Sequence, residues 1–408
     1  MGAIRELSER LLRGETTTAE VNPFALPIEL ESVADDVAFV SGFSNVGAIR
    51  TDEGLVLVDS GSVFFAAPMH EAVRRFSPSP LHTAVFTHGH VDHVFGLGPF
   101  VDEAKGKPRV VAHEAVPERF ARYRLTAGYN GVVNARQFGI PLAWPTEYPD
   151  VDLTYRDALR LEVGGVGLEL FHARGETDDH TFDFVPSRRV LFTGDLFIWA
   201  TPNAGNPQKA QRYAREWAAA LRRMEALDAE VLCPGHGPPI FGRGAVRLAL
   251  SETAELLEIL VEETLARLNA GATLDAILHE VRAPARLLER PYLRPVYDDP
   301  EFVVRNVARL YAGWWDGDPA ELKPAPKAEL AREIAALAGG ATKLADRARE
   351  LAKEGRLGLA GHLAELARKA APDDATIAEA HREVYRARAA AEPSLMARAI
   401  FLSAARDR

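Results

Sequence analysis

Three histidines and an aspartate lie close together in the stretch FTHGHVDH, residues 86–93. Imidazole and carboxylate groups are the usual ligands of borderline metal ions such as Zn2+. His88 and His90 are two residues apart, so a tight loop can direct both at one ion, while Asp92 and His93 suit a second ion. The glycine between the first two histidines lets the backbone turn without a Cβ clash. The spacing therefore predicts a metal site rather than an ordinary polar surface loop.

The elements that must position this loop are short, valine-rich strands. Apolar runs of this length, bounded by Gly and Asp, are typical of buried strands. The sequence predicts strands over residues 36–42, 54–61, 82–88, 108–114, 167–173, 188–195 and 229–237, and a helix over residues 210–227. Strands with helices interspersed indicate an α/β domain over residues 1–246, in which helices cover the sheets.

From residue 247 the periodicity is helical, and the end of the chain is rich in alanine. Gly271 stands where a helix C-terminal cap is expected after a long amphipathic helix. Residues 344–385 resemble one helix–turn–helix unit of the tetratricopeptide type, which cannot bury its apolar face without a stacked neighbour. We therefore expect an all-α domain over residues 247–408 that packs on the first domain or on a second subunit.

The bulk composition excludes several classes of protein. The chain has 408 residues, 47% of them hydrophobic, and a formal net charge of −10, which argues against binding to nucleic acid or anionic lipid. Its one cysteine cannot form an intramolecular disulfide, and the charged first 20 residues lack the apolar stretch of a secretory signal. No apolar run approaches the roughly 18 residues of a membrane span. We expect a cytoplasmic protein without a membrane span.

The motif at residues 86–93 and three further stretches resemble the metallo-β-lactamase superfamily in order and spacing: GLVLVDSG with Asp59, FTGDLF with Asp195, and PGHG with His236. The resemblance implies an αββα sandwich that holds two zinc ions and uses a metal-bridging hydroxide for hydrolysis. Manganese or iron would also suit the ligands. It implies that Asp59 is structural and that Asp92 and Asp195 are catalytic. The implied ligands are His88, His90 and Glu176 for the first ion, Asp92, His93 and His236 for the second, and Asp195 between them.

Glu176 departs from the common pattern of that superfamily. A histidine usually follows the strand that precedes FTGD, whereas the turn here reads ARGETDDH and places Glu176 at that position. His172 and His180 are the alternatives for the third ligand of the first ion. A carboxylate in place of an imidazole lowers the net charge of the site by one, which makes the bound ions weaker Lewis acids.

The same glutamate points to the alkyl sulfatases of this superfamily, which carry Glu at this turn. The stretch GWWDGDPAEL, residues 313–322, and its flanking helices resemble the dimerisation domain of that family. The resemblance implies a homodimer and a small-molecule ester or alkyl sulfate as substrate. The sterol-carrier-like domain that usually follows in those enzymes is expected to be absent.

Two departures from the alkyl sulfatases affect the expected substrate. Residues 196–208 contain no cation where that family places a sulfate-binding arginine, and Phe138 stands where that family has a tyrosine. Arg136, Phe138 and Trp199 are the candidate substrate contacts that remain. The predicted function is therefore an ester hydrolase similar to the alkyl sulfatases. The alternatives are a hydrolase of a lactone, thioester or phosphoester and a non-catalytic dimeric metal-binding protein.

Overall fold

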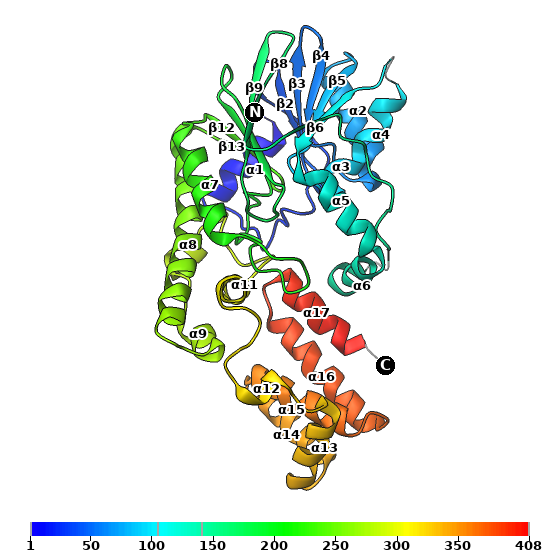
Figure 1. Ribbon diagram of the computed structural model, residues 1–408, viewed down its shortest axis with the longest axis vertical. Helices are drawn as coiled ribbons and strands as arrows, with labels where there is room; N and C mark the ends of the chain where they lie inside the picture. The colour runs from blue at the N-terminus through cyan, green and yellow to red at the C-terminus, as the bar shows by residue number, and fades with distance from the viewer. Residues whose placement is uncertain (1, 104–105, 140–141, 407–408) are drawn as a thin grey trace. The chain divides into compact units, whose positions relative to one another are not determined.

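The computed structural model describes residues 2–103, 106–139 and 142–406. The chain divides into two compact units (Figure 1). The first unit comprises residues 1–127, 144–272 and 277–311, and the second comprises residues 128–143, 273–276 and 312–408. The boundary that we drew between residues 246 and 247 falls inside helix α8 (Arg243–Asn269), which belongs to the first unit. The division into compact units does not test the predicted boundary between the two domains, which stays a prediction.

The first unit contains two mixed sheets. One has seven strands in the order of the chain, antiparallel from β1 to β4 and parallel from β4 to β7: β1 (Leu30–Ala34), β2 (Val37–Val40), β3 (Val46–Thr51), β4 (Gly54–Val58), β5 (Leu81–Val85), β6 (Arg109–His113) and β7 (Leu153–Tyr155). The other has six strands in the order β13-β12-β11-β10-β9-β8, with only β11 and β12 parallel. These are β8 (Ala158–Val163), β9 (Val166–His172), β10 (Thr181–Val185), β11 (Val190–Gly194), β12 (Val231–Pro234) and β13 (Ile240–Phe241).

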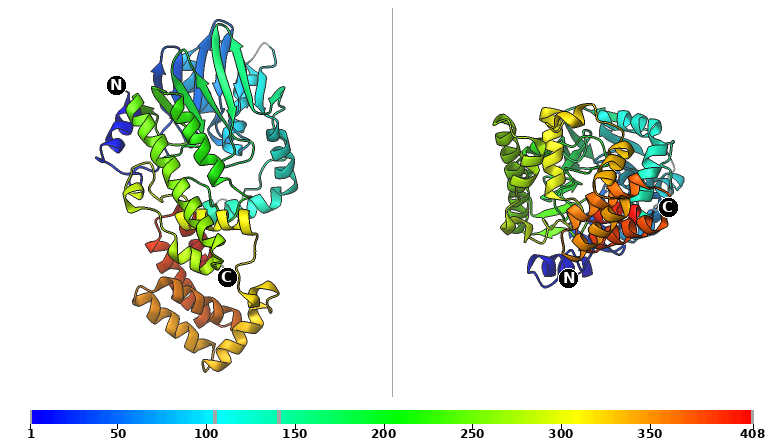
Figure 2. Two further views of the ribbon diagram at one scale, coloured as in Figure 1. Left: turned by 60° about the vertical axis from the view of Figure 1, so that its left-hand side comes forward. Right: turned by 90° about the horizontal axis from the view of Figure 1, so that it is seen from below.

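Helices cover the outer faces of the two sheets (Figures 1 and 2). α2, α4 and α5 lie on the side of the seven-stranded sheet, and α7 lies on the side of the six-stranded sheet with α8 packed against it. The elements lying wholly or largely in this unit are α1 (Ala3–Leu12), α2 (Ala66–Phe76), α3 (Val91–Val94), α4 (Gly98–Asp102), α5 (Ala115–Leu125), α7 (Ala214–Ala226), α8, α9 (Leu274–Glu280), α10 (Ala285–Leu288) and α11 (Pro300–Ala312), with the short 3-10 turns η1 (Val63–Phe65) and η2 (Phe95–Leu97).

The strand sequences explain this layering. All five residues of β4 are buried, with Val56 and Val58 in the core between the two sheets and Leu55 and Leu57 in the core beneath α2. A strand covered on both faces reads as a continuous apolar run because successive side chains point to opposite faces. The predicted αββα sandwich, followed by helices, is confirmed.

The second unit is helical. It contains α6 (Ala127–Phe138) for the most part, α12 (Pro319–Leu322), α13 (Lys327–Leu337), α14 (Ala341–Lys353), α15 (Leu357–Ala370), α16 (Ala375–Ala391) and α17 (Leu395–Arg406). α14 and α15 form the predicted helix–turn–helix pair, and Gly355 takes the positive φ of +79° that ends α14. α13 and α16 pack on this pair through small residues such as Ala335, Ala367 and Ala380. α13 thus supplies one neighbour within the same unit, while the expected packing on the first domain or on a second subunit stays a prediction.

No helix in the described part of the chain is long and apolar enough to cross a lipid bilayer.

The segment between Thr201 and Arg212 carries little regular structure, yet it is mostly buried and firmly held. Gly205 donates its backbone N–H to Asp298 Oδ2 at 2.8 Å, and Asn306 Nδ2 donates to the Ala204 carbonyl at 2.7 Å. A Cβ at Gly205 would lie 2.1 Å from the carbonyl carbon of Phe302, in the backbone of α11. Only glycine allows the segment to approach the helix this closely.

We predict that Gly205→Ala lowers the free energy of unfolding by about 1–3 kcal/mol, because a methyl group in a filled space forces the backbone to shift. Chemical denaturation with urea would measure the change. Gly244→Ala is the matched control, since a Cβ at Gly244 meets nothing within 4 Å and lies in the first turn of α8. Equal stability of the two variants would contradict the tight approach at Gly205.

Candidate metal centre

The buried carboxylate of Asp59, at the end of β4, organises the loop that bears the histidines. Its Oδ1 accepts the backbone N–H of Thr87 at 2.8 Å, and its Oδ2 accepts the Thr87 hydroxyl at 2.8 Å. The same Oδ2 lies 2.7 Å from His93 Nδ1. Asp59 itself has a φ of +58°, an uncommon value for a residue other than glycine and one that recurs at functional sites. The predicted structural role of Asp59 agrees with these contacts.

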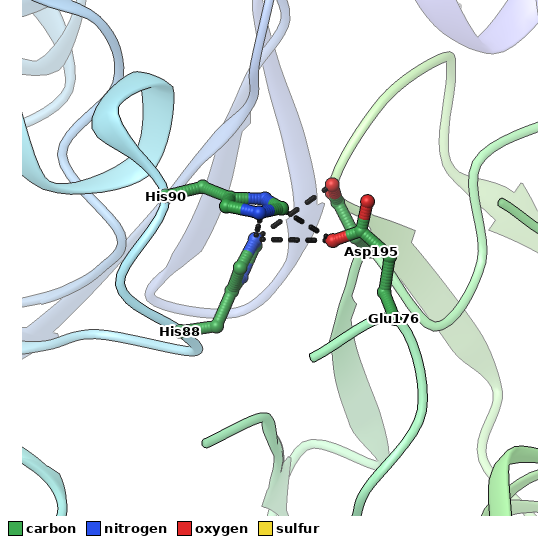
Figure 3. A group of neighbouring side chains, drawn as sticks. All are labelled: His88, His90, Glu176 and Asp195. Carbon is green, nitrogen blue, oxygen red and sulfur yellow. Dashed lines mark hydrogen bonds and ion pairs between the residues drawn. The ribbon is translucent and has the colours of Figure 1, made fainter. Parts of the chain in front are cut away.

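Seven side chains converge in two neighbouring groups, in each of which the potential ligand atoms lie within 4.8 Å of one another. The groups come from the loop after β5, the turn after β9, the end of β11 and the loop after β12. Their members are His88, His90, Glu176 and Asp195 in the first group, which Figure 3 shows, and Asp92, His93 and His236 in the second. The structure thus brings together every residue that the sequence nominated as a metal ligand.

The imidazole rings are oriented by hydrogen bonds on the side away from the groups. His93 Nδ1 donates to Asp59, and His236 Nδ1 donates to the carbonyl of Phe43. His88 Nδ1 lies 3.0 Å from the hydroxyl oxygen of Thr87, which itself donates to Asp59. In all three residues a proton on Nδ1 leaves the lone pair of Nε2 directed into the groups, the arrangement that metal-binding histidines require.

Asp195 joins the two groups through its two oxygens. Oδ1 lies 3.3 Å from His93 Nε2 and 3.4 Å from His236 Nε2, whereas Oδ2 lies 3.8 Å from His88 Nε2. A carboxylate that faces one set of imidazoles with each oxygen has the geometry needed to bridge two ions.

Buried polar atoms that lack a hydrogen-bond partner test whether the groups fit metal ions. His93 Nε2, Glu176 Oε2 and Asp195 Oδ1 are all buried without one, although such atoms are almost always paired in folded proteins. His88 Nε2 and His90 Nδ1 approach to 2.8 Å, a separation natural for two ligands of one ion. The donor set and the unpaired atoms fit two divalent cations.

Glu176 occupies the position that the sequence assigned to it in the first group. Its Oε2 lies 3.1 Å from His90 Nδ1, and its Oε1 accepts from Asn203 Nδ2 at 2.6 Å. Arg212 Nη1 lies 2.5 Å from the same Oε1. One carboxylate oxygen is therefore fixed by the protein and the other is directed at the group. Burial raises the pKa of Glu176, but the charges of Arg212 and His90 outweigh it and hold the pKa well below its usual range.

The two alternative ligands lie outside the groups and make other contacts. His180 Nε2 accepts the backbone N–H of Asp195 at 3.0 Å, and its ring stacks on His88 with 4.5 Å between centroids. His172 Nδ1 lies 3.0 Å from the His180 carbonyl. Both histidines thus support the segments that carry Asp195 and Glu176.

The charge states of His88 and Asp195 favour metal binding. For His93 and His236, in contrast, burial is outweighed by nearby carboxylates, which raise the pKa of both rings, so each would lose a proton when an ion binds. Burial, together with His93 and His90, lowers the pKa of His88 well below its ordinary value, so its ring is neutral at pH 7. Burial raises the pKa of Asp195, but His236 and His93 outweigh it and keep the carboxyl ionised. Neutral imidazole and ionised carboxylate are the forms that coordinate a cation.

A buried ion pair between α5 and the turn after β9 holds the histidine loop in place. Asp179 Oδ2 accepts the backbone N–H of Gly89 at 2.9 Å, and its Oδ1 accepts from Arg119 Nε at 2.6 Å. Asp179, Arg119 and Asn203 were not predicted from the sequence, nor was the pairing of Arg212 with Glu176. The acidic pair next to Glu176 was a visible signal for Asp179, whereas nothing in the spacing marked Arg119, 60 residues earlier.

The three candidate substrate residues lie in different surroundings. Trp199 is fully buried, with a φ of +54°, and donates its indole N–H to the carbonyl of Pro238 at 2.6 Å. Its predicted contact with substrate stays a prediction, which this burial does not favour. Arg136 and Phe138 are in α6, in the second unit, and their roles also stay predictions.

Comparison with known proteins finds a family match in each half of the chain. Residues 40–236 match the family model of the metallo-β-lactamase superfamily, and residues 273–408 match that of the alkyl sulfatase dimerisation domain. The resemblance predicted from the sequence is thus confirmed: a match to the metallo-β-lactamase superfamily is followed along the chain by a match to the alkyl sulfatase dimerisation domain.

Individual relatives agree with this assignment. The chain is 30% identical over 323 residues to a linear primary-alkylsulfatase of Pseudomonas sp. (strain ATCC 19151), covering 72% of this chain and 61% of the relative. It is 29% identical to an (R)-specific secondary-alkylsulfatase of Pseudomonas sp., covering 73% and 50%. The solved structure of the stereoselective inverting sec-alkylsulfatase Pisa1 from Pseudomonas sp. superposes with a TM-score of 0.82 at 25% identity, covering 93% of this chain and 65% of that one. The chain thus spans between half and two thirds of the length of these relatives.

We predict that Glu176→Ala lowers the metal content by one ion per chain, because it removes a carboxylate from the first group. Inductively coupled plasma mass spectrometry of the purified protein would count the ions. His172→Ala is the matched control, since His172 belongs to neither group. If the control loses an ion and Glu176→Ala does not, Glu176 is not the third ligand.

We predict that Asp179→Asn weakens metal binding about tenfold, as the loss of groups that orient metal ligands commonly does. The amide keeps the size of the side chain but removes the charge that pairs with Arg119. Competition with a chromogenic chelator would measure the affinity. Asp178→Asn is the control, because Asp178 pairs with Arg119 and Arg122 and makes no bond to Gly89. Equal affinities of the two variants would show that the charge of Asp179 does not help to position the loop.

Proposed function

We propose that this protein is a hydrolase that binds two divalent ions, zinc being the metal best suited to the ligands, and that it cleaves an ester bond in an alkyl sulfate or a related amphiphile. The observation that carries the proposal is Asp195, whose two oxygens face the two groups of buried ligands. Two ions held side by side activate water at neutral pH and polarise a substrate oxygen.

The residues of the protein prepare the site for this chemistry. The Nδ1 hydrogen bonds of His88, His93 and His236 fix the rings before any ion arrives, so little reorganisation is needed. The side chains of His88 and His93 have no exposed surface, whereas those of His90 and Asp92 are 13% and 20% exposed. We infer that substrate reaches the centre from the side of His90 and Asp92.

An alkyl sulfate is supported as substrate class by the relatives, which are named for alkyl sulfate hydrolysis. A lactone, thioester or phosphoester is the alternative, and it is favoured by the absence of any cation between residues 196 and 208. The matched dimerisation model supports a homodimer formed through residues 273–408. A cytoplasmic location stays a prediction from composition.

The proposal is tested by the release of inorganic sulfate from dodecyl sulfate. We expect the zinc-loaded protein to release sulfate, and we expect both the chelator-treated protein and the Asp92→Ala variant to release none above background. Asp92 belongs to the second group, and its loss removes one of three ligands there. Ion chromatography measures the product.

The controls separate the candidate substrates. Asp102→Ala removes a carboxylate at the end of α4, outside both groups, and should leave the rate unchanged. Release that does not depend on metal would contradict the proposed centre. Protein that carries two ions but hydrolyses a neutral ester or lactone instead of dodecyl sulfate would contradict the alkyl sulfate and leave the alternative.

A further inference from the structure

The first two cations that follow Asp195 in the chain are Lys209 and Arg212, and the structure gives them different surroundings. Arg212 is 4% exposed and is used within the protein. Its Nη1 lies 2.5 Å from Glu176 Oε1 and also donates to the Asn203 carbonyl at 2.8 Å. Its charge is therefore committed to a candidate metal ligand and is not free to bind a substrate anion.

Lys209 is half-buried, and its ammonium lies over the ring of Trp144, with Nζ 4.5 Å from the ring centroid. Across the described ranges 2–103, 106–139 and 142–406, this ammonium forms no side-chain hydrogen bond or ion pair. The face of an aromatic ring attracts a cation electrostatically, but it does not replace the oxygen acceptors to which an ammonium normally donates hydrogen bonds. The three N–H donors of Lys209 therefore remain available.

Aromatic rings connect Lys209 to the metal centre. Trp144 packs edge to face on Tyr123, with 4.5 Å between centroids, and Tyr123 stacks beside His90 at 6.4 Å. The segment that carries Lys209 is tied to the same place, because Asn203 and Arg212 at its two ends both bond to Glu176. These contacts link the ammonium to His90, and the carboxylates of Glu176 and Asp92 act on it electrostatically.

The electrostatic surroundings of Lys209 are those of a cation without a direct counter-ion. Burial, together with the charge of Arg212, lowers the pKa of Lys209 to about 8, although the carboxylates of Glu176 and Asp92 oppose both effects. At pH 7 the group is still mostly charged. A desolvated cation without a hydrogen-bonded partner gains from a nearby anion.

We propose that the Lys209 ammonium, held on the face of Trp144, is a binding subsite for a tetrahedral oxyanion, namely the charged sulfate end of the substrate. The inference rests on the proposed function, in that the oxyanion belongs to a molecule that reacts at the neighbouring metal centre. It explains how the chain can bind a sulfate ester although residues 196–208 carry no cation. Phosphate shares the relevant chemistry, so the experiment includes it.

The test is calorimetric titration of inorganic sulfate into the zinc-loaded full-length protein at constant ionic strength. We expect Lys209→Met, which keeps the length of the side chain and removes its charge, to weaken sulfate binding about tenfold or more. Lys209→Arg should retain most of the affinity. Lys343→Met removes an exposed lysine of α14 and should bind as the wild type does. Metal content and melting temperature are measured for each variant.

A second readout separates this subsite from a structural role. With dodecyl sulfate, Lys209→Met should raise KM about tenfold, whereas the turnover of a neutral ester should not change. Phosphate in place of sulfate shows whether the subsite distinguishes the two oxyanions; tighter binding of phosphate would overturn sulfate as its ligand.

Equal sulfate affinity in the wild type and in Lys209→Met, or no sulfate binding by the wild type, would overturn the subsite. These results are distinct from a failure of the proposed function. If no preparation hydrolyses any ester while sulfate binding still depends on Lys209, the catalytic proposal fails and the anion subsite stands. If hydrolysis depends on metal but Lys209→Met binds sulfate as tightly as the wild type does, only the proposed subsite is wrong.

Discussion

The buried carboxylate of Asp59 is the interaction on which the metal centre depends. It is 3% exposed and accepts hydrogen bonds from the backbone and hydroxyl of Thr87 and from His93 Nδ1. A buried carboxylate is costly unless it is paired, so these bonds hold both the start and the end of the histidine loop in one arrangement. The Thr87 hydroxyl, fixed by Asp59, in turn orients the ring of His88, whose Nδ1 lies 3.0 Å from that hydroxyl oxygen.

The loops of the second sheet supply the remaining side chains of the candidate metal centre. Among them, the negative charge of Glu176 is paired with a positive charge that the sequence did not predict. The sequence indicated that Glu176, in place of a histidine, lowers the charge of the site by one. The structure places Arg212 on the same carboxylate, 2.5 Å away, which restores that charge next to the ligand. For ions bound at this centre, that charge would offset the weaker Lewis acidity that the carboxylate alone implies. Asn203 binds the same oxygen and leaves the other one directed at the group.

The segment from Thr201 to Arg212 connects Glu176 of the candidate metal centre to the helices that follow the sandwich. Asp298, which precedes α11, accepts from Gly205, and Asn306 of that helix donates to the carbonyls of Ala204 and Arg212. The sequence assigned α11 to the helical domain, whereas its first 12 residues belong to the first unit. The helix thus fixes a loop near the metal ligands, and it keeps Arg212 and Lys209 at set positions.

The sequence by itself determined the principal strands and marked residues 86–93 as a ligand loop, because strand periodicity and ligand spacing are local properties of the chain. The sandwich and the other members of the two groups were implied by the resemblance to the metallo-β-lactamase superfamily. The sequence left Glu176, His172 and His180 open as the third ligand, and only the tertiary structure places Glu176 in the group. Partners such as Arg119 for Asp179, Arg212 for Glu176 and Trp144 for Lys209 were not foreseen, since they come from elements 60, 36 and 65 residues apart. No local pattern records which distant side chains meet. That is decided when the two sheets and their covering helices pack together.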